Sequence, residues 1–140
     1  MCARRLLHHD LCFGCGQANL FGLQLELGPS PDGGVDGRFF VKQDHQGPPG
    51  YAHGGVLAAA LDEAMALVLL AEGTPALTAR LEVDLLAPAP VGTFVRVEAE
   101  LEPSDARTLR LRARARSEDG DELAVARGVF VRVGEVGLDN

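Results

Sequence analysis

Residues 53–75 read HGGVLAAALDEAMALVLLAEGTP, and this stretch decides the fold. Apart from one acidic pair, its middle consists of alanine, leucine, methionine and valine, and most of these residues are strong helix formers. Gly73 and Pro75 stop a helix, so we predict one over residues 56–70. Because the predicted helix is apolar on nearly every side, we expect it to be buried on most sides.

The segments on both sides of this helix carry the alternating apolar and polar pattern of β-strands. The predicted strands cover residues 22–28, 35–41, 77–86, 93–102, 108–117 and 123–133. We expect the first two to form a hairpin and the last three to form an antiparallel meander, because short turns separate them. In the last strand, Leu123, Val125, Val129, Val131 and Val133 are predicted to share the buried face. The sequence therefore predicts an α+β fold in which an antiparallel sheet curls around one central helix.

The chain of 140 residues is long enough for one domain with one sizeable core. Only 5% of the residues are aromatic, so the core must be aliphatic. We expect residues 22–133 to form this domain, residues 1–21 to pack on it, and residues 134–140 to be a loose tail.

Charge and cysteine content narrow the function classes. The formal net charge of −7 argues against nucleic acid and anionic membranes as partners. Asp62 and Glu63 break the longest apolar stretch, which argues against a membrane span, and His8, His9 and Asp10 break the N-terminal one, which argues against a signal peptide. All three cysteines lie in the first fifteen residues and do not form a disulfide framework, so we expect a cytoplasmic protein.

Four arginines occupy alternate positions of the predicted strand 108–117. The preceding strand offers Glu98, Glu100 and Glu102 on what we expect to be the same face. Opposite-charge pairs across neighbouring strands stabilise a sheet by roughly 0.2–1 kcal/mol each. We therefore interpret the arginines as a solvated charge ladder rather than as a phosphate-binding surface.

Asp62 and Glu63 lie in the middle of the apolar helix, where an unpaired buried charge costs much free energy. Adjacent helical residues point about 100° apart, so at least one of the two must face polar surroundings. The presence of Glu63 in this helix is explained equally well by a solvent-exposed helix edge, by a salt bridge to the sheet, or by a function.

For Asp62, the residues before the helix favour a function. Gly54 and Gly55 let the backbone turn sharply after His53 and let a ligand approach closely. The free N–H groups of a first helical turn attract anions and stabilise a carbonyl oxygen that gains negative charge.

His53 and Asp62 are nine residues apart on the predicted helix. That separation places them roughly 13 Å apart along the axis and about half a turn out of phase. If both act in one site, we expect them to come from different chains, which predicts a site shared across a dimer interface.

Several reaction types are excluded by missing patterns. The sequence has no G-x-S-x-G motif, which argues against a serine nucleophile, and it has neither a Walker loop nor a Rossmann glycine pattern. Cys12 and Cys15 have the spacing of metal ligands, but no second cysteine pair completes a four-ligand zinc site. The remaining ligands would have to come from Cys2, His8, His9 or His45. We therefore expect no metal and no cofactor, and interpret this loop as packing on the sheet.

Taken together, these residues resemble those of the hotdog-fold acyl-CoA thioesterases of the PaaI-like and thioesterase-superfamily member 4 type. The resemblance covers residues 12–133. Its marks are Cys12-Phe13-Gly14-Cys15-Gly16, Asn19, Gly22-Leu23, His45-Gln46-Gly47, His53-Gly54-Gly55, Asp62-Glu63, Thr78 and Pro88-x-Pro90-x-Gly92.

The resemblance implies a homodimer, often a tetramer, that hydrolyses an acyl-CoA thioester. It implies that Asp62 is the catalytic carboxylate, acting as general base or as nucleophile. The amides of Gly54 and Gly55 would polarise the thioester carbonyl, and His53 would orient this loop or contact the substrate. Thr78 would help to place the water near Asp62, on the same chain as Asp62.

One position departs from the family pattern. Relatives often carry asparagine six residues before the His-Gly-Gly, where this chain has Gly47. Gln46 is the candidate to replace the missing amide, with His45 as its competitor, and Glu63 is a further candidate substrate contact. Two other functions stay open: a non-catalytic acyl-CoA-binding protein, and a hydratase or dehydratase on the same fold.

Overall fold

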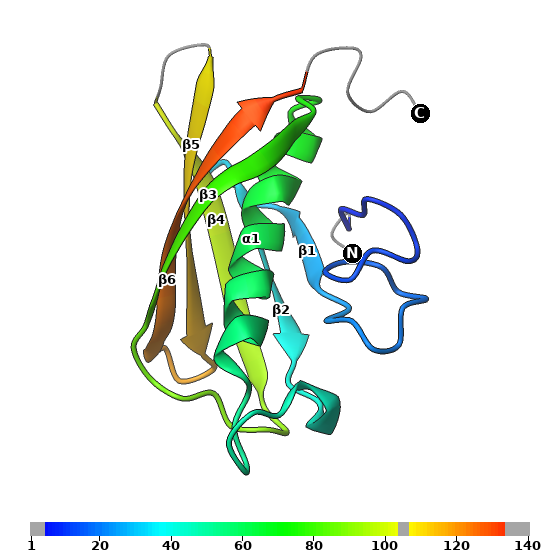
Figure 1. Cartoon of the computed structure of the whole chain (residues 1–140), viewed down its shortest axis with the longest axis vertical. Coiled ribbons are helices and arrows are strands. Elements are labelled where there is room, and N and C mark those ends of the chain that lie inside the picture. The colour runs from blue at the N-terminus through cyan, green and yellow to red at the C-terminus, as the bar shows by residue number, and fades with distance from the viewer. Residues whose placement is uncertain (1–4, 104–106, 134–140) are drawn as a thin grey trace.

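The computed structural model describes residues 5–103 and 107–133, so Cys2 and the predicted tail 134–140 lie outside the described residues. One long helix, α1 (Gly54–Ala71), lies against a six-stranded antiparallel sheet that curls around it (Figure 1). The strands are β1 (Glu26–Pro29), β2 (Val35–Phe40), β3 (Ala76–Leu85), β4 (Phe94–Glu102), β5 (Thr108–Ser117) and β6 (Glu122–Arg132), and a short 3-10 helix, η1 (Gln43–His45), follows β2.

The strand order is β1-β2-β4-β5-β6-β3, with every neighbouring pair antiparallel. This order confirms the predicted α+β architecture, the β1–β2 hairpin and the β4–β5–β6 meander. β3 lies beyond β6 as an edge strand, and its second edge pairs with no strand in the described part of the chain.

β1 is shorter than predicted and begins at Glu26. The residues before it pair with the N-terminal segment instead, since Leu23 N–H donates to Phe13 O at 2.8 Å and Leu25 N–H donates to Gly14 O at 2.9 Å. Gln24 between them has a φ of 51°, which no regular strand allows. The N-terminal segment thus forms an irregular cover beside β1 and α1 (Figure 1).

The core is aliphatic, as the composition predicts. Eight residues of α1 are buried, and the largest of them pack against the inner face of the sheet. The largest fully buried side chains are Phe39, Phe130, Leu23, Leu25, Leu27, Leu61, Met65, Leu67, Leu111, Val35, Val41 and Val95. By length and composition alone α1 could also cross a membrane, but a core helix passes the same test.

The predicted buried face of β6 holds at Leu123, which is buried, but is wrong for the rest of the strand. Ala124, Ala126 and Phe130 are buried, whereas Val131 on the other face is 47% exposed. Both faces of this strand carry apolar residues, so alternation does not distinguish them. Gly128 shows which side faces the helix, because a Cβ there would lie 3.1 Å from the Met65 side chain.

The charge ladder on the outer face of the sheet is confirmed. The register places Arg112 opposite Glu100 and Arg114 opposite Glu98. Arg112 Nε lies 3.0 Å from Glu100 Oε1. These exposed pairs contribute little free energy each, and they lie on the face of β4 and β5 that meets solvent.

Candidate active site

His53 caps the N-terminus of α1. Its backbone is extended, with ψ of 137°, and its Nδ1 accepts a hydrogen bond of 2.8 Å from Gly55 N–H. This side-chain cap satisfies one of the four N–H groups that a helix start leaves without a partner. The helix therefore begins at Gly54, two residues earlier than predicted.

The cap changes the predicted pair of oxyanion donors. Gly55 N–H is engaged by His53, whereas Gly54 N–H has no hydrogen-bond acceptor within residues 5–103 and 107–133. Gly54 also lies close to the sheet, because a Cβ there would come within 2.7 Å of Leu85 Cδ1. The helix start therefore presents the free Gly54 amide beside the edge strand.

Thr78 reaches α1 because β3 has a bulge. Simple alternation would put Thr78 on the same face as Arg80, but the register with β6 shifts between these two residues. Thr78 consequently lies opposite the buried Phe130, and opposite residues of neighbouring strands share a face. Its hydroxyl donates a 2.7 Å hydrogen bond to Asp62 Oδ1.

The surroundings of Asp62 favour its protonated form. Partial burial raises the pKa of the Asp62 carboxyl above its ordinary value. The hydrogen bond from Thr78 opposes this rise, and the nearby charge of Glu63 adds to it. A raised pKa makes an ionised carboxylate a stronger proton acceptor, as general-base catalysis requires.

Asp62 and the free amide of Gly54 lie on one helix without touching each other. The helix geometry separates Asp62 from His53 by roughly 13 Å along the axis and about half a turn. Asp62 is directed instead toward Thr78 on β3, the strand that ends the sheet. One copy of the chain therefore holds the two parts of the predicted site in separate places.

His45 has a structural role. Its ring is buried, Nδ1 accepts from Lys42 N–H at 3.1 Å, and Nε2 lies 3.1 Å from Gly22 O. Because Nδ1 accepts, Nε2 carries the proton and donates to this carbonyl. Both ring nitrogens are thus engaged, which argues against the predicted contact between His45 and a substrate.

Gln46 and Gly47 lie in the loop that leads to His53. Gln46 Oε1 accepts from Gly50 N–H at 2.6 Å, which anchors the side chain and leaves its amide nitrogen as the available donor. A Cβ at Gly47 would lie 2.8 Å from the Cα of His53. Asparagine would not fit there in this loop, which gives a physical reason for the departure from the family pattern.

Glu63 points away from Thr78, toward the N-terminal segment. Its Oε2 lies 2.8 Å from His8 Nδ1 and 3.6 Å from Cys12 Sγ. The side chain is only 13% exposed. This cluster is one that reasoning from sequence missed, because its members are separated by about fifty residues of chain.

The match to a known family is specific. The sequence model of the thioesterase superfamily matches residues 49–124 of this chain, which is more than half of its length. The matched region includes His53, Asp62 and Thr78. The chain belongs to the thioesterase superfamily. This membership confirms the resemblance to the hotdog-fold thioesterases.

Among curated proteins, the human acyl-coenzyme A thioesterase THEM5 is 33% identical over 89 residues. The match covers 63% of this chain and 36% of the relative, so this chain spans well under two thirds of that protein's length.

Two solved structures show the same fold. A thioesterase superfamily protein of known crystal structure is 27% identical, with a TM-score of 0.82 over 93% of this chain and 68% of that chain. A hypothetical thioesterase from Streptococcus pneumoniae, crystallised with coenzyme A, is 20% identical, with a TM-score of 0.73 over 79% of this chain and 86% of that chain.

The hydrogen bond from Thr78 predicts how the pKa of Asp62 responds to substitution. In Thr78→Val the carboxylate loses its donor, so the pKa of Asp62 should rise further, whereas Thr78→Ser should keep the wild-type value. Carbon-13 NMR titration of the aspartate carboxyl groups measures this directly. An unchanged pKa in Thr78→Val would show that the hydrogen bond does not form.

Proposed function

We propose that this chain hydrolyses an acyl-CoA thioester to a free carboxylic acid and CoA. The observation that carries the proposal is the partly buried Asp62, held by Thr78 through a 2.7 Å hydrogen bond. The second support is the free Gly54 N–H at the start of the same helix, the kind of group that stabilises a developing oxyanion.

The comparisons support this substrate class. The human relative is named as an acyl-coenzyme A thioesterase, and the Streptococcus pneumoniae protein was crystallised with coenzyme A. Alanine variants of that bacterial protein at one aspartate and one threonine have also been crystallised. Those two residues lie sixteen positions apart, as Asp62 and Thr78 do in this chain.

The proposed reaction uses Asp62 as general base. Asp62 takes a proton from a water that Thr78 helps to position, and the water oxygen bonds to the thioester carbonyl carbon. Gly54 N–H of the partner subunit donates to the carbonyl oxygen as it gains negative charge. The carbon–sulfur bond then breaks, and the sulfur takes the proton from Asp62 to leave as the CoA thiol.

A second copy of the chain would complete the site. The edge strand β3 exposes leucines that an isolated domain would bury, with Leu77 at 55%, Leu81 at 37% and Leu85 at 54% exposure. An edge strand with a free, apolar side pairs readily with another strand. We propose that β3 pairs with its copy, which covers these leucines and brings the partner's helix start to Asp62.

Replacing the proposed base should remove activity without unfolding the protein. Thiol release from a panel of acyl-CoA esters should fall by about 100-fold or more in Asp62→Asn, since general-base catalysis contributes about 10²–10⁴-fold. The pKa of Asp62 is raised on folding, so its charge lowers stability once the pH rises through that pKa. Asp62→Asn should therefore melt no lower than wild type at pH 7.

The matched control is Asp36→Asn, because Asp36 is an exposed residue of β2. Full thiol release in Asp62→Asn would contradict the mechanism. Binding of CoA esters by wild type without thiol release would favour the non-catalytic alternative. Conversion of an enoyl-CoA without thiol release would favour the hydratase.

The oxyanion donor is tested by removing one N–H group. Proline fits the first position of a helix and follows an extended residue such as His53 without strain. Gly54→Pro should lower kcat by about 10²–10³-fold, the usual effect of losing one oxyanion donor. Gly54→Ala adds a similar Cβ against Leu85 but keeps the N–H. Equal losses in both variants would mean that crowding, rather than the missing donor, impairs the enzyme.

A further inference from the structure

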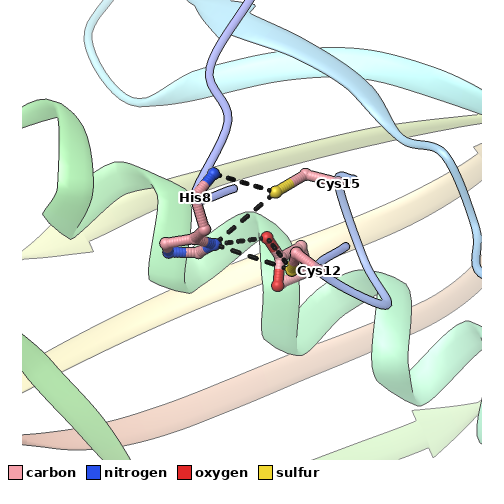
Figure 2. A group of neighbouring side chains, drawn as sticks. His8, Cys12 and Cys15 are labelled. Atoms are coloured by element: carbon pink, nitrogen blue, oxygen red, sulfur yellow. Dashed lines mark hydrogen bonds and ion pairs between the residues drawn. The ribbon is translucent and has the colours of Figure 1, made fainter. Parts of the chain in front are cut away.

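Four side chains with metal-binding atoms converge where the N-terminal segment crosses α1. They are His8, Cys12, Cys15 and Glu63, and their ligand atoms all lie within 4.8 Å of one another. Figure 2 shows the side chains of His8, Cys12 and Cys15 pointing toward one point above the helix. Cys15 is fully buried, so the cluster is covered by protein on one side.

We propose that these four side chains bind one zinc ion. Around a zinc ion with Zn–S of about 2.3 Å and Zn–N of about 2.0 Å, tetrahedral sulfur and nitrogen ligands lie about 3.5 Å apart. His8 Nδ1 lies 3.6 Å from Cys15 Sγ and 3.9 Å from Cys12 Sγ. Cys12 Sγ lies 3.6 Å from Glu63 Oε2.

The two ligand atoms in direct hydrogen-bond contact must move apart for the ion to fit. His8 Nδ1 and Glu63 Oε2 are 2.8 Å apart, in direct hydrogen-bond contact. A tetrahedral nitrogen–oxygen edge is about 0.5 Å longer. A small rotation of the Glu63 side chain supplies this distance, since its bonds to the carboxylate are free to turn.

The loop that carries the cysteines is shaped for this cluster. A Cβ at Gly14 would lie 2.4 Å from the Glu63 Cγ, and one at Gly16 would lie 2.5 Å from Cys12 N. Only glycine allows the loop to close so tightly over the helix. His8 N–H also donates to Cys15 Sγ at 3.1 Å, an outer contact of the kind that orients a metal ligand.

The donor set selects the metal. Two thiolates and an imidazole suit zinc, whereas calcium and magnesium take oxygen ligands. Four protein ligands complete the coordination of zinc, so no position stays open for water or substrate. The site is therefore structural, and it would fasten the N-terminal segment to α1 beside Asp62.

The proposed zinc site differs from the prediction made from the sequence alone, that no metal binds. The spacing of Cys12 and Cys15 made His8 one possible further ligand. All of the other candidate ligands were cysteines or histidines. The fourth ligand is Glu63, which comes from α1, 51 residues after Cys12. The same contact explains why a carboxylate is tolerated in an apolar helix.

Metal content tests the proposal on the full chain. Protein purified from cells grown with added zinc should hold about one zinc ion per chain, because the four ligands form one closed site. The protein exchanged into cobalt should show thiolate-to-cobalt charge transfer and the visible bands of tetrahedral cobalt. Bound zinc should also protect Cys12 and Cys15 from alkylation, and a chelator should remove both the protection and part of the thermal stability.

Neighbouring histidines provide the matched variants. His8→Ala should weaken zinc binding by more than the 10–100-fold that loss of an outer contact typically costs, whereas His9→Ala should bind as wild type does. If His8→Ala does not fold, the cobalt spectrum and the cysteine alkylation of the wild-type protein still test whether the site binds metal. The proposal would be overturned if the wild-type protein held no zinc, or if Cys12 and Cys15 formed a disulfide instead. It would also be overturned if His8→Ala and His9→Ala lost zinc binding equally.

Discussion

The structure depends on burying a helix that is apolar on nearly every side. The sheet curls around α1 to do so, and this burial makes the two acidic residues of the helix costly unless each finds a polar partner. Asp62 accepts a hydrogen bond from the Thr78 hydroxyl on the edge strand, and Glu63 contacts His8 of the N-terminal segment. Although adjacent in sequence, the two carboxylates thereby face different elements of the fold.

Most of the fold could be predicted because one signal, the alternation of apolar and polar residues, is strong in almost every strand. The observed bounds of β5 coincide with the predicted ones, and the arginine ladder follows from its register with β4. The prediction failed where that signal is ambiguous. β6 is apolar on both faces, so the choice between Val131 and Phe130 as the buried side depends on packing against Met65.

The candidate site was predictable in kind but not in detail. Asp62 in an apolar helix after two glycines is visible in the sequence. A one-residue bulge turns Thr78 toward it, and no local pattern indicates that bulge. The cap at His53 uses Gly55 N–H, which depends on a side-chain rotamer. The contact between Glu63 and the cysteine loop joins residues that are far apart in the sequence, so the spacing of motifs along the chain does not predict it.

The central claim is that one chain holds half of each active site, and subunit complementation tests it most directly. Asp62→Asn and Gly54→Pro subunits, each inactive alone, are mixed and the heterodimer is isolated by two affinity tags. If the sites are shared, one of the two sites of the heterodimer combines an intact Asp62 with an intact Gly54. Thiol release should then return to about half the wild-type rate per dimer. A heterodimer as inactive as its parents would contradict the account.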